Sequence, residues 1–231
     1  MKTDGIASAA HALRYWERRQ EVASNNLANV NTAGFKGERI FARLMGEGVP
    51  TADSATDFRE GTYSPTGNAL DLAIRGDAYF VVNTPAGERW TRGGAWSVDT
   101  EGFLVDSEGN RALGEKGPIH VAGTEVAIDR TGLVIVDEMK IDRLRIEAPA
   151  SGAVLQHEAG TRFVPDSGRT SVALDAREVR QGEIEGSNVN TISSLVDLIS
   201  IQRNYANAQK VLTTLDGIRG TITNELGKVP G

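Results

Sequence analysis

Apolar residues recur every three or four positions at both ends of this chain of 231 residues. This spacing gathers them on one face of a helix, so residues 3–30 and 188–226 are predicted to form two long helices. The C-terminal helix would measure roughly 58 Å at about 1.5 Å per residue. Helices of this length need a partner surface, which favours a coiled-coil-like pair over burial within a small globule.

Each helix carries one apolar stripe, and each stripe is interrupted once. The N-terminal stripe has a gap at Gln20 and comprises Ile6, Ala10, Leu13, Trp16, Ala23, Leu27 and Val30. The C-terminal stripe comprises Ile192, Leu195, Ile199, Ala208, Val211, Leu215, Ile218, Ile222 and Leu226. Residues 200–210 set polar side chains where the second stripe should continue. A polar break in a helical seam can fix register and partner choice, as a protein that must assemble in one lattice requires.

The middle of the chain changes to a period of two, which predicts strands. The candidate strands are 70–74, 78–82, 89–91, 95–98, 103–105, 119–121, 125–128, 133–136, 144–146 and 162–164. Three turns share the pattern Asp-x-x-Gly, at 99–102, 106–109 and 129–132. This pattern suits a type I turn followed by a left-handed glycine, so it indicates hairpins.

These patterns together predict an α+β fold with paired long N- and C-terminal helices, coiled-coil-like, and a central, mostly antiparallel β domain. The terminal helical domain is expected to comprise residues 1–36 and 184–231. Residues 37–69 are expected to form an extended connection, and residues 70–183 the central β domain.

Four asparagines fall within seven positions near the end of the first helix, although asparagine is a poor helix former. One interpretation is a frayed helix end, with Gly34 as the residue just past the helix and Phe35 folding back. The other places the amides in a packed interface, where they bond to neighbouring helices. Both interpretations stay open on the residues alone.

Composition excludes several classes of protein. The chain has no cysteine, so disulfides, thiol catalysis and cysteine metal sites are excluded. No run approaches the length of a membrane-spanning helix, and the N-terminus has no apolar core of a cleavable signal peptide. The net charge is −6, and no basic cluster of the kind that binds nucleic acid is present.

Candidates for site chemistry are few. His11, His120 and His157 have no metal-binding spacing, and the Asp-x-x-Gly turns lack the later glutamate of a calcium loop. A carbohydrate platform built on the aromatic residues of the strands is conceivable, but a packed core explains them better. The sequence therefore predicts a protein that is not an enzyme, with no catalytic residues, metal or cofactor.

Three blocks of the sequence resemble bacterial flagellar rod and hook proteins. Residues 22–36 resemble the N-terminal signature of that family, and residues 182–190 with 198–205 resemble the C-terminal one. Residues 66–80, 90–94 and 99–105 are similar to the β domain of the larger members. Hook subunits carry outer domains for which this chain has no room, and the smallest proximal rod subunits lack most of the middle. Residues 114–119 look more like the FlgF-like branch of the rod proteins, with the distal rod protein, FlgG, as second choice.

This resemblance implies a structural subunit of the basal-body rod, the helical drive shaft that crosses the periplasm and transmits torque to the hook. Its partners would be further copies, proximal and distal rod subunits and the type III export apparatus, with no nucleic acid and no direct membrane insertion. Export would proceed without a cleavable signal peptide. The expected assembly interface comprises Asn25, Asn26, Leu27, Asn29, Gly34, Phe35, Asn188, Asn190, Leu195, Ile199, Gln202, Arg203, Tyr205 and Leu215.

Two hypotheses from other classes compete with this interpretation. One is a periplasmic hydrolase that uses acidic residues of the β domain. The other is an adaptor whose helices bind a single partner. Turnover on peptidoglycan would favour the first, and normal swimming after removal of residues 1–30 would contradict the rod.

Overall fold

The computed structural model describes residues 5–44, 50–150, 155–165 and 168–226, which form two compact units. The first, here the helical unit, draws on residues 1–28, 38–57 and 190–231. The second, the β unit, comprises residues 29–37 and 58–189. The fold is α+β, as predicted, with one helix near each end of the chain.

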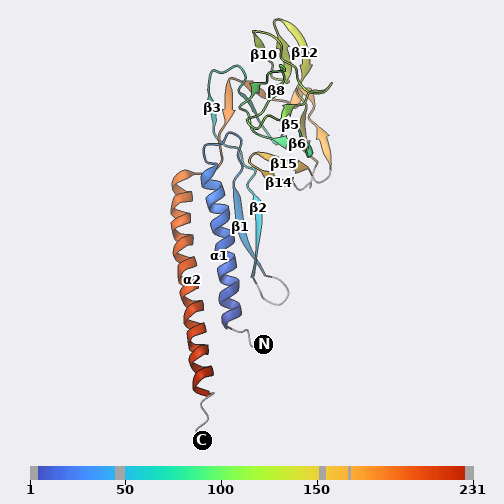
Figure 1. The fold of residues 1–231 in the computed structure, drawn as a ribbon. Helices are drawn as coiled ribbons and strands as arrows, with labels where there is room; N and C mark the ends of the chain where they lie inside the picture. The colour runs from blue at the N-terminus through green and yellow to red at the C-terminus, as the bar shows by residue number, and fades with distance from the viewer. Residues whose placement is uncertain (1–4, 45–49, 151–154, 166–167, 227–231) are drawn as a thin grey trace. The chain divides into compact units, whose positions relative to one another are not determined.

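The helical unit contains the helices α1, Gly5–Ala28, and α2, Thr191–Leu226, which lie side by side (Figure 1). A hairpin of the strands β1, Glu38–Leu44, and β2, Pro50–Thr56, also packs against α1. This hairpin lies within the segment predicted as an extended connection. Its first strand alternates, with Ile40 half-buried and Phe41 exposed, and the Gly- and Pro-rich sequence that follows hid this signal.

Helix α2 presents apolar residues on two faces. Ile201 is buried, and Leu198, Leu212 and Leu215 are half-buried on the side that α1 covers. Much of the predicted stripe, including Ile199, is instead exposed on another side. One stripe was predicted where the helix has two. Ile199 and Ile201 lie only two positions apart, but such residues point to different faces of a helix.

The β unit is built from antiparallel pairs. Its largest sheet has the order β14-β15-β6-β5-β9-β8-β7, with β13 and β16 joined through β5, and a second sheet has the order β10-β11-β12. Two short pairs, β17 with β4 and β18 with β3, bring the end of the unit back to its start. The strands are β3 Tyr63–Pro65, β4 Leu72–Ile74, β5 Tyr79–Thr84, β6 Gly87–Thr91, β7 Ser97–Val98, β8 Leu104–Val105, β9 Arg111–Ala112, β10 Val126–Ile128, β11 Leu133–Val136, β12 Met139–Arg143, β13 Ile146–Pro149, β14 Leu155–Ala159, β15 Arg162–Pro165, β16 Arg169–Ser171, β17 Val179–Gln181 and β18 Glu183–Glu185, with a 3₁₀ turn at Leu174–Ala176.

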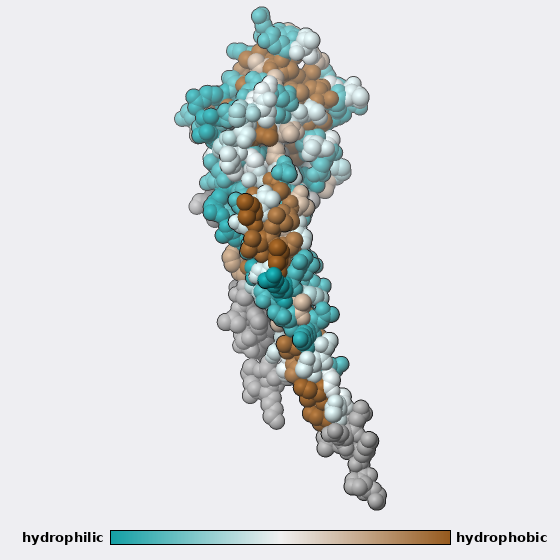
Figure 2. Space-filling view, turned by 90° about the vertical axis from the view of Figure 1, so that its left-hand side faces the viewer, coloured by the Kyte–Doolittle hydropathy of each residue, from teal (hydrophilic) through white to brown (hydrophobic). Residues whose placement is uncertain are grey.

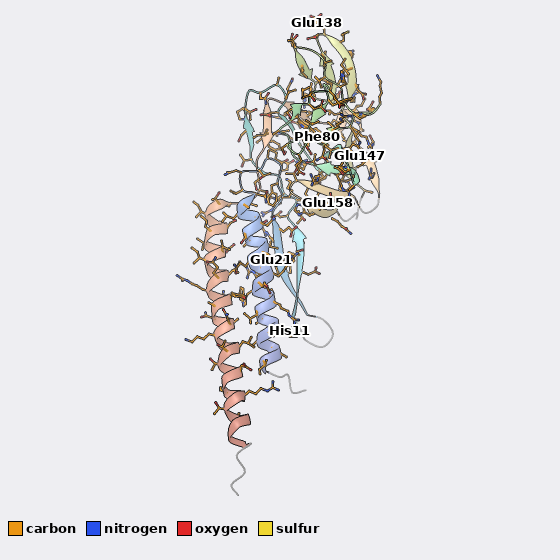
Figure 3. The ribbon with its side chains drawn as sticks, in the orientation of Figure 1. His11, Glu21, Phe80, Glu138, Glu147 and Glu158 are labelled. Carbon is orange, nitrogen blue, oxygen red and sulfur yellow. The ribbon has the colours of Figure 1, made fainter. Side chains whose placement is uncertain are left out.

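The core of the β unit has two clusters on either side of β5. Phe80, labelled in Figure 3, belongs to the larger cluster and meets Trp96 edge-on at 5.7 Å between ring centroids. In the smaller cluster Tyr79 stacks on Trp90 at 5.4 Å. Alternate residues of one strand thus serve two hydrophobic layers, and the aromatic residues of the strands are core residues.

The three Asp-x-x-Gly turns form as predicted. In each, the glycine N–H donates to the aspartate carbonyl at 2.9–3.0 Å, and the glycine has a φ of 83–85°. In each, the aspartate Oδ1 also accepts N–H bonds from the second and fourth residues after it, at 2.8–3.0 Å. The aspartates are therefore structural residues of turns.

Several local expectations were wrong. Residues 119–121 form only one isolated bridge, between His120 and Phe103. Strand β12 was missed, because its turn uses Asp137 and Glu138, both with positive φ, in place of the usual glycine. Glu138 is labelled in Figure 3. Gly34 does not cap the first helix, since α1 ends at Ala28 and Gly34 belongs to the β unit.

Candidate assembly surface

The outer side of α2 carries an exposed apolar surface in two patches (Figure 2). We call them the upper patch, which comprises Ile192, Leu195, Val196 and Ile199, and the lower patch, which comprises Val211, Ile218 and Ile222. Each of these side chains is between 44 and 75% exposed. Seven large apolar side chains on one helix exceed the scattered exposure that is normal for a monomer, so they indicate a surface that another molecule covers.

A polar segment separates the two patches, and it appears as the hydrophilic band between them in Figure 2. Gln202, Arg203, Asn207 and Lys210 are exposed there. This is the break that the sequence predicted, and it lies on the outer side of the helix.

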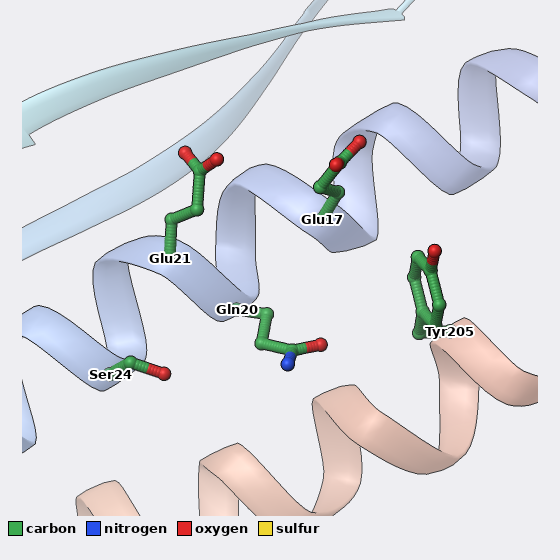
Figure 4. Close-up of a pocket in the computed structure, with 5 residues that line it drawn as sticks. All are labelled: Glu17, Gln20, Glu21, Ser24 and Tyr205. Atoms are coloured by element: carbon green, nitrogen blue, oxygen red, sulfur yellow. The ribbon is translucent and has the colours of Figure 1, made fainter.

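A concave site lies between the two helices of the helical unit. It has a volume of about 470 Å³ and is lined by Glu17, Gln20, Glu21 and Ser24 of α1 and by Tyr205 of α2 (Figure 4). The four residues of α1 recur at spacings of three and four, so they share one helical face. We call this site the polar groove. Arg18 donates to Glu21 at its edge, at 2.8 Å.

Two of the predicted asparagines shape the ends of the helices. The Asn190 side chain accepts the N–H of Ser193 at 2.9 Å, which makes Asn190 the N-cap of α2. The Asn26 amide bonds to both backbone groups of Glu38, at 2.8 and 2.9 Å, and so joins α1 to the start of β1. Asn25 is exposed and Leu27 half-buried.

Other predicted residues lie inside the β unit. Phe35 is fully buried, and Gly34 donates its N–H to the Glu185 carbonyl at 2.7 Å. The Asn188 amide spans two segments, since it accepts from Gly37 N–H at 2.8 Å and donates to the Arg59 carbonyl at 3.0 Å. Asn29 accepts a bond from the Thr32 hydroxyl in the turn after α1.

A buried charge cluster that sequence reasoning missed holds these segments together. Glu185 Oε1 accepts from Lys36 Nζ at 2.6 Å and from Gly61 N–H at 2.8 Å. Its other oxygen pairs with Arg92 at 2.8 Å, and Arg92 also donates to the carbonyls of Gly76 and Ala78 at 2.6 Å. Lys36, Arg92 and Glu185 are at most 3% exposed. We call these three residues the buried junction.

The electrostatics of the junction follow from burial. Desolvation lowers the pKa of Lys36, and the hydrogen bond and charge of Glu185 oppose this shift. Burial also raises the pKa of the nearby Tyr79 to about 12. Such a cluster stays charged only while all its members are paired. It joins a residue that follows α1 to one that precedes α2.

The structure thus brings the predicted residues together in two groups rather than one. Leu195, Ile199, Gln202 and Arg203 are exposed on α2, while Tyr205 and Leu215 lie on the side toward α1. Gly34, Phe35 and Asn188 lie in the β unit. The signal for the missed junction was a charged residue within each signature segment, Lys36 beside Phe35 and Glu185 at an inward strand position.

Comparison with known protein families matches three parts of the chain. Residues 6–36 match the flagella basal body rod protein family, residues 73–136 the D1 domain of the flagellar hook proteins FlgE/F/G, and residues 180–225 the C-terminal domain of the flagellar basal body rod proteins FlgEFG. The chain is also 31% identical to the flagellar basal-body rod protein FlgF of Rhizobium meliloti, over 96% of its own length and 98% of that protein.

The chain belongs to the flagellar basal-body rod protein family. It is 27% identical to the FlgF of Caulobacter vibrioides, over 92% of its length and 93% of that protein. It is 29% identical to the FlgG of Agrobacterium fabrum, over 96% of its length and 98% of that protein. The FlgF-like assignment and the structural, non-enzymatic class agree with the interpretation of the sequence, and the hydrolase is not favoured.

Two features are absent from the described residues. Neither α1 nor α2 combines the length and hydropathy that crossing a membrane requires. In the same residues, the histidines and acidic side chains form no group of three that could hold a metal ion.

Proposed function

We propose that this protein is a FlgF-like structural subunit of the flagellar rod and that its helical unit packs side by side with the helical units of other rod subunits. The observation that carries this proposal is the exposed apolar outer side of α2, which stays uncovered although the opposite side already packs on α1. Burial of apolar surface drives most association between proteins, so neighbouring helices are the natural cover. A coiled-coil-like layer of terminal helices would result.

The β unit would hold the segments next to the two helices in place. Its buried junction ties the segment after α1 to the segment before α2, so a force applied to the helices would be carried by charge-assisted bonds as well as by packing. This arrangement suits a shaft that transmits torque.

The partners and location follow from the same proposal. Other flagellar rod components are the expected neighbours, and the periplasmic span of the basal body is the expected location. Export through the flagellar type III apparatus is the expected route, and the absence of cysteine suits it, because no disulfide would need to form or break.

Two substitutions on one helix test the proposal. Ile199 is 51% exposed and Ile201 is 3% exposed. With Ile199→Asp as the chromosomal copy, we expect the purified chain to unfold as the wild type does, but basal bodies to lose the subunit and the cells to stop swimming. Ile201→Asp should instead destabilise the chain itself, because it buries a carboxylate.

A matched control separates assembly from a general surface effect. Met139→Asp places the same charge at an exposed apolar position of the β unit, 65% exposed, and should leave swimming unchanged. Normal swimming of the Ile199→Asp strain, with the subunit present in its basal bodies, would contradict the proposal.

A further inference from the structure

The polar groove on α1 and the polar segment on α2 interrupt their apolar stripes in a similar way. Along α1, the half-buried Ile6, Ala10 and Leu13 precede the groove and Leu27 follows it. Along α2, the upper patch precedes Arg203 and the lower patch follows it. Along each helix, an apolar segment is therefore followed by a polar segment and then by a second apolar segment.

Contacts between the helices show that these breaks lie at the same level. A Cβ on Gly5, at the start of α1, would lie 3.7 Å from the Leu215 side chain of α2. Ten residues earlier on α2, Tyr205 lines the groove with Glu17 and Gln20 of α1. The helices are therefore antiparallel, and Arg203 lies within one turn of the level of the groove. Arg203 faces away from it, on the outer side of α2.

The charges of the two breaks are complementary. Among the described residues, the exposed Arg203 guanidinium has no carboxylate partner, and the Glu17 carboxylate has no cationic partner. Glu21 pairs with Arg18, but both side chains are at least half exposed, so this pair can rearrange. One surface is an unpaired arginine within an apolar stripe, and the other is an acidic groove between apolar residues. These two surfaces are the two halves of an interface.

We propose that the outer side of α2 of one copy packs against the polar groove of a second copy, with Arg203 between Glu17 and Glu21. This inference rests on the proposed function and names the partner of its surface. The two patches would flank the ion pair and exclude water from it, which strengthens the attraction. Because the two surfaces differ, one copy of the pair would keep a free groove and the other a free outer side, so the contact could extend.

The arrangement also explains why a polar residue interrupts the stripe. A slide of α2 by two turns, about 11 Å, would place Arg203 against the apolar residues at either end of the groove and leave its charge unpaired. The ion pair therefore selects a single register from several that the apolar patches alone would allow.

Charge reversal on the full chain tests this pairing. Strains would carry Arg203→Glu, the double change Glu17→Arg with Glu21→Arg, or all three as the only copy, and subunit recovery in purified basal bodies would be measured. We expect about a tenfold or greater loss in each partial reversal and recovery close to wild type in the triple variant, since it restores opposite charges between copies. Arg130→Glu, at an exposed arginine of the β unit, is the matched control and should have no effect.

The outcomes separate the pairing from the proposed function. If the partial reversals lose the subunit and the triple variant does not recover it, the outer side of α2 has a partner of different sequence, and the pairing between copies is wrong. Full recovery in the Arg203→Glu strain also overturns the pairing, while loss in the Ile199→Asp strain would leave the rod function standing. Circular dichroism of each purified variant confirms that loss reflects assembly and not unfolding.

Discussion

At the scale of single residues, the segments next to the helices depend on close packing around the buried junction. Gly34 has a φ of 73°, and a Cβ there would lie 2.1 Å from the Arg92 carbonyl oxygen. Only glycine combines this backbone conformation with so close an approach. Gly34 and Lys36 lie close together in the sequence. Arg92, against which they pack, is distant in the sequence, so the spacing of residues does not predict this contact.

Two glycine substitutions separate conformation from packing. Gly67 has a φ of 74° and nothing within 4 Å of its Cβ position, so Gly67→Ala should lower the free energy of unfolding by about 1 kcal/mol. Gly34→Ala has the same conformational cost and must also displace the Arg92 backbone, which should add about 1–3 kcal/mol. Urea denaturation followed by tryptophan fluorescence measures both, and equal losses would show that the close approach does not matter.

The junction itself is tested at Glu185. Glu185→Gln removes the charge that compensates Lys36 and Arg92, both almost fully buried, and should lower the free energy of unfolding by about 3–5 kcal/mol. Glu178→Gln removes a carboxylate that pairs with Arg180 at the surface and should leave the free energy of unfolding close to that of the wild type. The same urea titration compares them, and a loss for Glu185→Gln no larger than that of the control would refute a structural role for the cluster.

At the scale of elements, period and turn chemistry predicted most of the fold. The helices and the three Asp-x-x-Gly hairpins were expected because their signals are local. Strand β12 was not, since its turn relies on positive φ at Asp137 and Glu138, which the flanking sequence alone does not reveal. The β1–β2 hairpin was missed because its pairing depends on the surface of α1, a contact distant in sequence.

The cap of α2 gives a prediction for a whole element. Asn190→Ala removes the acceptor of the Ser193 N–H. The free energy of unfolding of the helical unit should therefore fall by about 1 kcal/mol. Asn190→Asp keeps an acceptor and adds a negative charge at the helix N-terminus, so it should match or exceed the wild type. Circular dichroism at the helical minimum, recorded against temperature, measures both variants. An alanine variant as stable as the aspartate variant would show that the cap is dispensable.

At the scale of the molecule, the sequence predicted the apolar residues of α2 as one stripe but not their division between two sides of the helix. The stripes were expected to pair the two helices, and the structure shows that α2 uses one side for α1 while Leu195 and Ile199 remain exposed on the other. The spacing of apolar residues along the sequence does not show which of them face α1 and which stay exposed, because this depends on where α1 lies. The asparagines Asn26 and Asn190, expected at an interface between subunits, bond within their own chain.

The two units should therefore differ in stability in the isolated chain. The β unit has a core of buried strands and a closed charge cluster, whereas the helical unit leaves one side of α2 exposed. Amide hydrogen exchange on the dilute chain should accordingly be slow in β5 and β6 and markedly faster in α2, because local opening needs less free energy where fewer apolar contacts are lost. In purified basal bodies, exchange in α2 should slow to the level of the strands, since neighbouring subunits would then cover both patches. Exchange in α2 that is already as slow as in β5 in the dilute chain would mean that the helical pair is stable without neighbours, and the exposed patches would need another explanation.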